Sequence, residues 1–267
     1  MLITFIGGGN MATALVSGLV NPPRAHLKIR VCDPSESARD HLEKTFGVPT
    51  FNDSADAIEG ADVIVLAVKP QTMPAVLDRL RGRINEDQMI LSIAAGITID
   101  SIRLELGPQQ AVIRSMPNTP ALVGHGITGI VAGEHCTTRH LQQAEEILAA
   151  AGEVVWLDDE SLMDAVTAIS GTGPAYFFLL TEALSAAARD LGLPAETSDR
   201  LASITCFGAG AMLASSPGEA EELRLRVTSP GGTTQAAMVV LEDGRFRDLV
   251  FRAAKAACKR SRELAIK

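Results

Sequence analysis

The chain has 267 residues, enough for two domains of ordinary size, and 46% hydrophobic with 21% charged residues is typical of a folded globular protein. Its formal net charge of −8 gives no electrostatic support to a nucleic-acid or anionic-membrane partner. No apolar run reaches the ~20 residues of a membrane span, the first residues lack the basic head of a signal peptide, and no two cysteines form a C-x-x-C pair. We therefore expect a cytoplasmic protein with reduced thiols.

Residues 1–158 alternate short β-branched runs with helical segments, which is the pattern of βαβ units. The expected strands are Leu2–Ile6, Ile29–Cys32, Asp62–Val68, Met89–Ala94, Ala111–Ser115, Gly129–Val131 and Val154–Leu157. The expected helices between them are Met11–Val20, Ser35–Phe46, Gln71–Leu80 and Arg139–Ala151. This α/β pattern predicts a Rossmann-type domain with a doubly wound, parallel sheet.

Residues 159–267 contain no convincing strand and predict an all-α domain. The expected helices are Ser161–Ile169, Pro174–Leu191, Ala195–Ala214, Gly218–Val227, Thr233–Leu241 and Arg247–Ala265. These helices are rich in alanine and apolar on more than one side. A large core within one chain would use such faces, but we favour a subunit interface because a helical domain this small cannot cover that much apolar surface alone. We therefore expect at least a homodimer.

A glycine-rich turn follows the first expected strand. Gly7, Gly9 and Ala12 fit G-x-G-x-x-A, in which the first glycine allows the tight turn and the second lets the backbone approach a pyrophosphate. The helix that begins there offers free N–H groups to the phosphates. This turn predicts an NAD(P)-binding site formed by Ile6, Gly7, Gly8, Gly9, Asn10 and Met11.

An acid closes the second expected strand. Asp33 stands where an aspartate would bind the ribose 2′-OH of NAD. Ser35 opens the next helix, whose N-terminus can instead seat the 2′-phosphate of NADP. The nearest arginine, Arg39, lies one turn further on. The sequence leaves NADP and NAD open at this position.

Two more strand ends are expected beside the cofactor, because ligands bind outside the carboxyl ends of the strands in such sheets. The segments are predicted cofactor contacts, and they comprise Ala67, Val68, Lys69 and Pro70 after one strand and Ala94, Ala95 and Gly96 after the next.

A loop rich in hydroxyl groups precedes the helix expected at Thr233–Leu241. Thr228 and Ser229 lead into Pro230-Gly231-Gly232, and the helix opens with Thr233 and Thr234. A helix N-terminus with small flanking residues is suited to an anion. We expect Ser229, Gly232, Thr233 and Thr234 to bind the substrate, with the Thr233 side chain as the helix cap.

The helical domain lacks a well-placed proton donor for ketone reduction, since residues 159–267 contain no histidine and their three lysines, Lys255, Lys259 and Lys267, all lie in the last expected helix. A protonated imine already carries its charge on nitrogen, so hydroxyl and backbone N–H groups suffice to orient it.

Several motifs together resemble the pyrroline-5-carboxylate reductase family, which catalyses the last step of proline synthesis. The resemblance covers essentially the whole chain. Its carriers are Gly7-Gly8-Gly9-Asn10-Met11-Ala12, Ala67-Val68-Lys69-Pro70, Met116-Pro117-Asn118-Thr119-Pro120, Ser170-Gly171-Thr172-Gly173-Pro174-Ala175-Tyr176 and Val227-Thr228-Ser229-Pro230-Gly231-Gly232-Thr233-Thr234. The last of these is the family signature.

The resemblance implies an NAD(P)-binding domain at 1–158 and a helical substrate and dimerisation domain at 159–267. It implies NAD(P)H-dependent reduction of 1-pyrroline-5-carboxylate to L-proline, with NADP(H) favoured and NAD(H) as the alternative. It also implies a homodimer with an active site shared between subunits, and a decamer of dimers as a larger assembly.

The resemblance also assigns roles to residues. Thr234 matches the family threonine whose hydroxyl is placed at the imine nitrogen, so it is the predicted catalytic residue. The N–H groups of Thr233 and Thr234 would hold the substrate carboxylate, and Glu160 matches an acid near the substrate. Thr172 and Arg226 depart from the family's usual serine and asparagine.

Two other functions stay open from the residues alone. A carboxylate-binding loop cannot measure ring size, so a reductase of another cyclic imine acid is the first alternative. A catalytically silent NADP-binding regulator is the second. No metal site is expected, because Glu134-His135-Cys136 lacks the paired spacing of zinc ligands.

Overall fold

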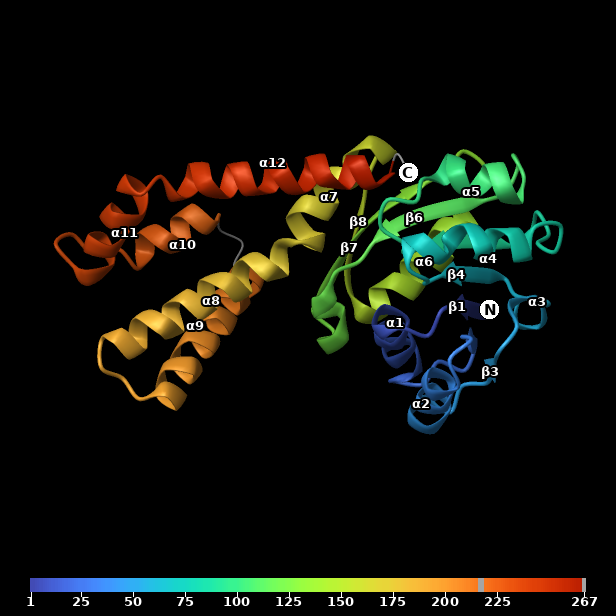
Figure 1. The fold of residues 1–267 in the computed structure, drawn as a ribbon, viewed down its shortest axis with the longest axis horizontal. Coiled ribbons are helices and arrows are strands. Elements are labelled where there is room, and N and C mark those ends of the chain that lie inside the picture. Colours follow the sequence, from blue (N-terminus) through green and yellow to red (C-terminus); the bar gives the residue numbers. More distant parts are fainter. Residues whose placement is uncertain (216–218, 266–267) are drawn as a thin grey trace. The chain divides into compact units, whose positions relative to one another are not determined.

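The computed structural model describes residues 1–215 and 219–265, which form two compact units (Figure 1). The first unit contains residues 1–172 and the C-terminal stretch that begins at Ala257, and the second contains residues 173–256. The sequence placed the domain boundary earlier, after residue 158. The difference arises because Met163 is buried in the core of the first unit and Val166 packs closely against Gly129. The predicted boundary between an NAD(P)-binding domain at 1–158 and a helical domain at 159–267 stays a prediction.

An eight-stranded sheet forms the centre of the first unit, in the order β3-β2-β1-β4-β5-β6-β7-β8. The strands are β1 (Leu2–Ile6), β2 (Lys28–Cys32), β3 (Thr50–Phe51), β4 (Val63–Leu66), β5 (Met89–Ser92), β6 (Val112–Met116), β7 (Gly126–Ala132) and β8 (Gly152–Trp156). The predicted Rossmann-type, doubly wound sheet is confirmed. The expectation that all strands are parallel is wrong at one pair, because β7 runs antiparallel to β6. Only the short turn η2 (Thr119–Val123) joins these strands, and a parallel crossover needs a dozen or more residues.

Helices cover both faces of this sheet. One buried cluster joins strand residues such as Phe5 and Val65 to α1, α2 and α6, and another joins Ile64 and Leu66 to α3, α4 and α5. These helices are α1 (Asn10–Val20), α2 (Glu36–Phe46), α3 (Ser54–Ala57), α4 (Met73–Leu80), α5 (Ile99–Leu106) and α6 (Thr138–Leu148). The core strands are buried on both faces, which fits their continuous apolar sequence.

The second unit consists of helices joined by short loops, and its described residues form no strand. It contains α8 (Gly173–Asp190), α9 (Ala195–Ser215), α10 (Ala220–Arg226), α11 (Thr233–Asp243) and most of α12 (Phe246–Ala265). The predicted helix 218–227 begins at a residue outside the described ranges. Many large apolar side chains of this unit are exposed by more than half, among them Phe177, Phe178, Ile204, Phe207, Val240 and Phe251. Such a surface is what an interface between subunits needs.

All four cysteines (Cys32, Cys136, Cys206 and Cys258) are free. Among the described residues, no helix combines the length and the apolar character that crossing a bilayer requires.

Candidate active site

The first unit brings the predicted cofactor segments together at one edge of the sheet. The strands β1, β2, β4 and β5 are parallel, so their carboxyl ends meet there. Neighbouring segments are joined directly, since the Gly7 N–H donates to the Cys32 carbonyl (2.8 Å) and the Ala67 N–H donates to the Ile6 carbonyl (2.8 Å). This edge is where ligands bind in open α/β sheets.

Gly7 has the backbone geometry that the glycine-rich turn requires. Its φ is +105°, and a Cβ at this position would lie 2.6 Å from the Ala67 carbonyl oxygen. The helix α1 then begins at Asn10 with Gly9 as its N-cap and with no side chain bonded to the cap. Its first N–H groups are therefore free for an anion, and no acidic side chain lies in the first turn. These features fit the pyrophosphate of a dinucleotide.

Asp33 is tied to the backbone of both neighbouring turns. Its Oδ2 accepts a hydrogen bond from the Gly8 N–H (2.8 Å), and its Oδ1 accepts one from the Ser35 N–H (2.8 Å). Ser35 caps α2 through its hydroxyl, and Glu36 follows in the first turn. Arg39 is directed onto the Asp33 and Pro34 carbonyls (2.8 and 3.0 Å). Two carboxylates therefore lie at the α2 N-terminus, and the nearest arginine is already bonded.

Two other side chains lie at this edge. Lys69 is exposed, and within residues 1–215 and 219–265 it forms no ion pair, so its ammonium group is available to a phosphate. Burial raises the pKa of the Cys32 thiol to about 11, with the carboxylates of Asp53 and Asp33 adding to the shift. The thiol therefore stays protonated and unreactive at neutral pH.

Glu160 forms a half-buried ion pair inside the first unit. Its Oε1 lies 2.7 Å from Nη1 of Arg114, whose side chain is 6% exposed, and it also accepts the Ile99 N–H at the start of α5 (3.0 Å). The sequence predicted a substrate contact for Glu160 and did not identify Arg114 as its partner. The structure gives Glu160 a bracing role, and its contact with substrate stays a prediction.

Replacing Glu160 with glutamine should lower the free energy of unfolding by about 2 kcal/mol, because Arg114 would lose its charged partner. The loss is smaller than for a fully buried pair, since the Glu160 side chain is 27% exposed. Urea unfolding measures the change, with replacement of the exposed Glu153 by glutamine as the control. An unfolding free energy equal to that of the control would contradict the bracing role.

The hydroxyl-rich loop lies in the second unit and ends at a bare helix N-terminus. Gly231 has φ +71°, which favours glycine, and Gly232 is the N-cap of α11 with no side-chain cap bond. Thr233 and Thr234 are thus the first two helical residues, and their N–H groups have no partner within the helix. The expected capping role of the Thr233 side chain is therefore wrong. Thr233 is exposed, whereas Thr234 is half-buried.

Comparison with known proteins gives two family models and full-length relatives. Residues 160–264 match the model described as pyrroline-5-carboxylate reductase dimerisation, and residues 2–96 match the model described as NADP oxidoreductase coenzyme F420-dependent. A pyrroline-5-carboxylate reductase from Pseudomonas aeruginosa is 46% identical over 263 residues, covering 98% of this chain and 96% of the relative. One from Corynebacterium melassecola is 40% identical over 265 residues, covering 98% of both chains.

Solved structures agree with these relatives. The pyrroline-5-carboxylate reductase of Coxiella burnetii has a TM-score of 0.94 at 40% identity, over 98% of both chains. A Plasmodium falciparum pyrroline carboxylate reductase with NADP bound has a TM-score of 0.86 at 29% identity, over 99% of this chain and 98% of the other. The chain belongs to the pyrroline-5-carboxylate reductase family. It is an oxidoreductase, as its motifs predicted.

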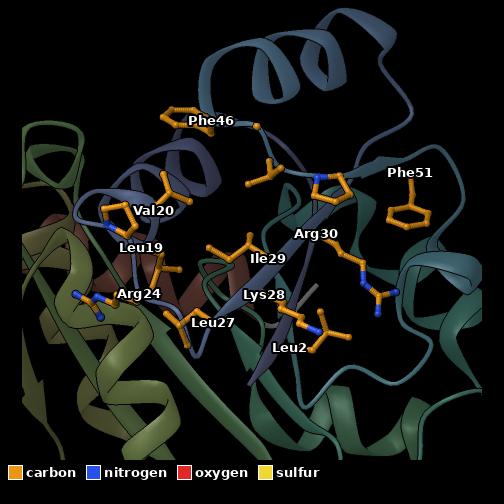
Figure 2. Close-up of a pocket in the computed structure, with 14 residues that line it drawn as sticks. Leu2, Leu19, Val20, Arg24, Leu27, Lys28, Ile29, Arg30, Phe46 and Phe51 are labelled. Carbon is orange, nitrogen blue, oxygen red and sulfur yellow. The ribbon is translucent and has the colours of Figure 1, made fainter.

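A hollow of about 600 Å³ lies at the amino ends of β1 and β2 (Figure 2). None of the predicted cofactor or substrate residues lines it. Two arginines line it, but both have partners within the protein. Arg24 lies 3.7 Å from Glu146, and Arg30 donates to the Ala57 and Glu59 carbonyls (3.3 and 3.0 Å). Arg24 is therefore paired with a carboxylate, whereas the partners of Arg30 are neutral carbonyl oxygens.

The described residues contain no group of three histidine, cysteine or acidic side chains able to hold a metal ion. The sequence did not identify Asn118 as a buried polar side chain with a positioning role. Asn118 is 8% exposed and follows β6 at the carboxyl edge of the sheet, whereas the sequence identified only the whole segment Met116-Pro117-Asn118-Thr119-Pro120 as a family motif. A polar residue enclosed by Met116-Pro117 and Thr119-Pro120 was the available signal.

Proposed function

We propose that this chain reduces 1-pyrroline-5-carboxylate to L-proline, the last step of proline biosynthesis. The observation that carries the proposal is the bare N-terminus of α11, where Thr233 and Thr234 follow the glycine turn with free N–H groups. These groups can bind a carboxylate, which is the anion of the substrate. Three relatives named pyrroline-5-carboxylate reductase, which are 39–46% identical across nearly the full chain, support the assignment.

The reaction adds one hydride to the carbon of the C=N bond and leaves one proton on the nitrogen. A bound nicotinamide dinucleotide supplies the hydride. The N–H groups of Thr233 and Thr234 hold the carboxylate, and the Thr234 hydroxyl orients the ring nitrogen. Ser229 and Gly232 shape the loop, and Glu160 is proposed to border the substrate.

The cofactor is proposed to bind along Ile6 to Met11, with Ala67 to Pro70 and Ala94 to Gly96 beside it. The NADP-type family model and the NADP-bound Plasmodium falciparum structure support a nicotinamide dinucleotide, and we favour NADP(H). Asp33 and Glu36 oppose a 2′-phosphate, which keeps NAD(H) as the alternative. Asp33 and Ser35 are the proposed determinants of this choice.

We propose that the protein forms a homodimer through its helical domain, with a decamer of dimers as the larger assembly. The exposed apolar side chains of α8, α9, α11 and α12 support an interface, as does the dimerisation model at residues 160–264. We also propose a cytoplasmic location with neither a nucleic-acid nor a membrane partner, supported by the net charge of −8 and the free cysteines.

Light scattering at micromolar concentration should give at least the mass of two chains. Replacing the exposed Phe207 of α9 with glutamate should shift the mass toward one chain, because a charge would be buried in the interface. Replacing the exposed Leu104 of the first unit with glutamate is the control. A single-chain mass for the unchanged protein would reject the homodimer.

A steady-state assay separates the three functions. Oxidation of NADPH and of NADH is followed with five-membered and six-membered cyclic imine acids. We expect turnover with the five-membered ring to be much the faster. Preference for the six-membered ring would favour the other reductase, and no turnover with either ring would leave the silent NADP-binding regulator.

A further inference from the structure

The segment that leads out of the first unit contains an unusual helical turn. The helix α7 (Met163–Val166) continues into a π-helical turn, η5 (Thr167–Gly171). The Thr172 N–H donates to the Thr167 carbonyl five residues earlier (2.8 Å), and the Thr172 hydroxyl donates to the same carbonyl (2.7 Å). Single π turns are rare and often occur at functional sites.

One carbonyl of this turn lacks its α-helical donor. In a regular helix the Ser170 carbonyl would accept the N–H of residue 174, but residue 174 is proline and has no N–H. Asn118 supplies the donor, because its Nδ2 lies 3.1 Å from the Ser170 oxygen. Its Oδ1 accepts the Ile127 N–H at the start of β7 (3.0 Å). The buried amide therefore connects β7 to the π turn, with its oxygen accepting one hydrogen bond and its NH2 group donating one.

The π turn also packs against the edge of the sheet at which the candidate site lies. Met116 ends β6, which runs parallel to β5. A Cβ at Gly171 would come within 2.7 Å of the Met116 methyl carbon, so the turn lies directly on this strand end. Ligands of open α/β sheets bind outside such carboxyl ends.

We propose that Asn118 is a positioning residue for the reduction. By bonding the Ser170 carbonyl, it holds the π turn in one conformation at the carboxyl edge, so that the protein surface beside the reacting groups keeps its shape. The proposal rests on the proposed reductase function and deepens it. Asn118 acts through Ser170 and is not itself a catalytic residue.

The replacement Asn118→Asp tests the donor. An ionised carboxylate still accepts the Ile127 N–H, but it has no proton for the Ser170 carbonyl, whereas a neutral carboxyl group has one. Burial beside a carbonyl raises the pKa of such a group, so the neutral form gains as pH falls. We expect kcat to be about fivefold below that of the unchanged protein at about pH 8, and to recover toward about pH 5.5.

Gln88→Glu is a matched control. Gln88 is also a buried amide that accepts one backbone N–H, from Asn85 (2.9 Å), and donates to the Ile58 and Ala61 carbonyls (3.1 and 2.9 Å). It lies just before β5, at the amino end of that strand. We expect this variant to change the melting temperature with pH and to keep the kcat profile of the unchanged protein.

The dissociation constant of NADPH and the KM for the imine acid should stay within about twofold in Asn118→Asp. Two outcomes would overturn the positioning role and leave the proposed function standing. One is a dependence of kcat on pH in Asn118→Asp that equals that of the unchanged protein. The other is a fall in kcat that Gln88→Glu shows to the same extent when both variants lose the same amount of melting temperature. No turnover by the unchanged protein would reject the proposed function and this inference together. If Asn118→Asp does not fold, Asn118→Ser is tested in its place. Adding Pro174→Ala to that variant gives residue 174 an N–H that can bond the Ser170 carbonyl, so part of the lost kcat should return. If kcat does not rise, the positioning role is wrong.

Discussion

Replacing Thr234 with valine is expected to lower kcat about a hundredfold and to leave NAD(P)H binding within about twofold. Valine keeps the shape of threonine and its backbone N–H, so the bare N-terminus of α11 can still bind the substrate carboxylate. Only the hydroxyl proposed at the imine nitrogen is lost. A donor that acts mainly in the transition state should lower kcat and kcat/KM together, and steady-state kinetics with a fluorescence titration of NADPH measures both effects.

Thr233→Val is the matched control. Thr233 is the preceding residue of the same turn, but its side chain is exposed and forms no cap bond. We expect a much smaller fall in kcat for this variant. If Thr234→Val instead raised KM and left kcat unchanged, the hydroxyl would contribute uniform binding, and its catalytic role would be wrong.

Replacing Asp33 with serine is expected to raise the ratio of kcat/KM for NADPH to that for NADH about tenfold. The carboxylate of Asp33 repels a 2′-phosphate and occupies the Gly8 and Ser35 N–H groups. Serine removes the charge and releases these donors, which can then bind phosphate oxygens. Initial rates with the two cofactors, measured at one ionic strength because the effect is electrostatic, give the ratio.

Glu36→Gln is the control for charge alone. Glu36 lies in the first turn of the same helix, so this variant removes a nearby charge without releasing the Gly8 N–H. A smaller shift in the ratio is expected. An unchanged ratio in Asp33→Ser would show that the Pro34-Ser35 turn or another residue determines the cofactor preference.

The sequence predicted the strands of the sheet well where they are long and buried. It failed for a very short strand and for the direction of one strand. The expected strand Leu2–Ile6 agrees with β1, because its apolar run and the glycine turn after it are local signals. The strand β3 has two residues, too few for a pattern, and was missed. The reversed direction of β7 depends on the length of its connection, and apolar periodicity does not report direction.

The candidate site shows the same division. The glycine turns at Gly7 and Gly231 could be predicted, since both have positive φ that their motifs imply. The partners of Asp33 and Glu160 could not, because the Gly8 N–H and the Arg114 guanidinium reach them through folding of distant segments. The link between Asn118 and Ser170 was hidden for the same reason, although Pro174 marks the carbonyl that needs a donor.

Isotope transfer tests the central claim most directly. The protein is incubated with 1-pyrroline-5-carboxylate and NADPH that carries deuterium at the transferable position, and the product is analysed by mass spectrometry and NMR. We expect L-proline with one deuterium at carbon 5 and an equal amount of oxidised cofactor. Proline without deuterium, or no proline with either NADPH or NADH, would contradict it.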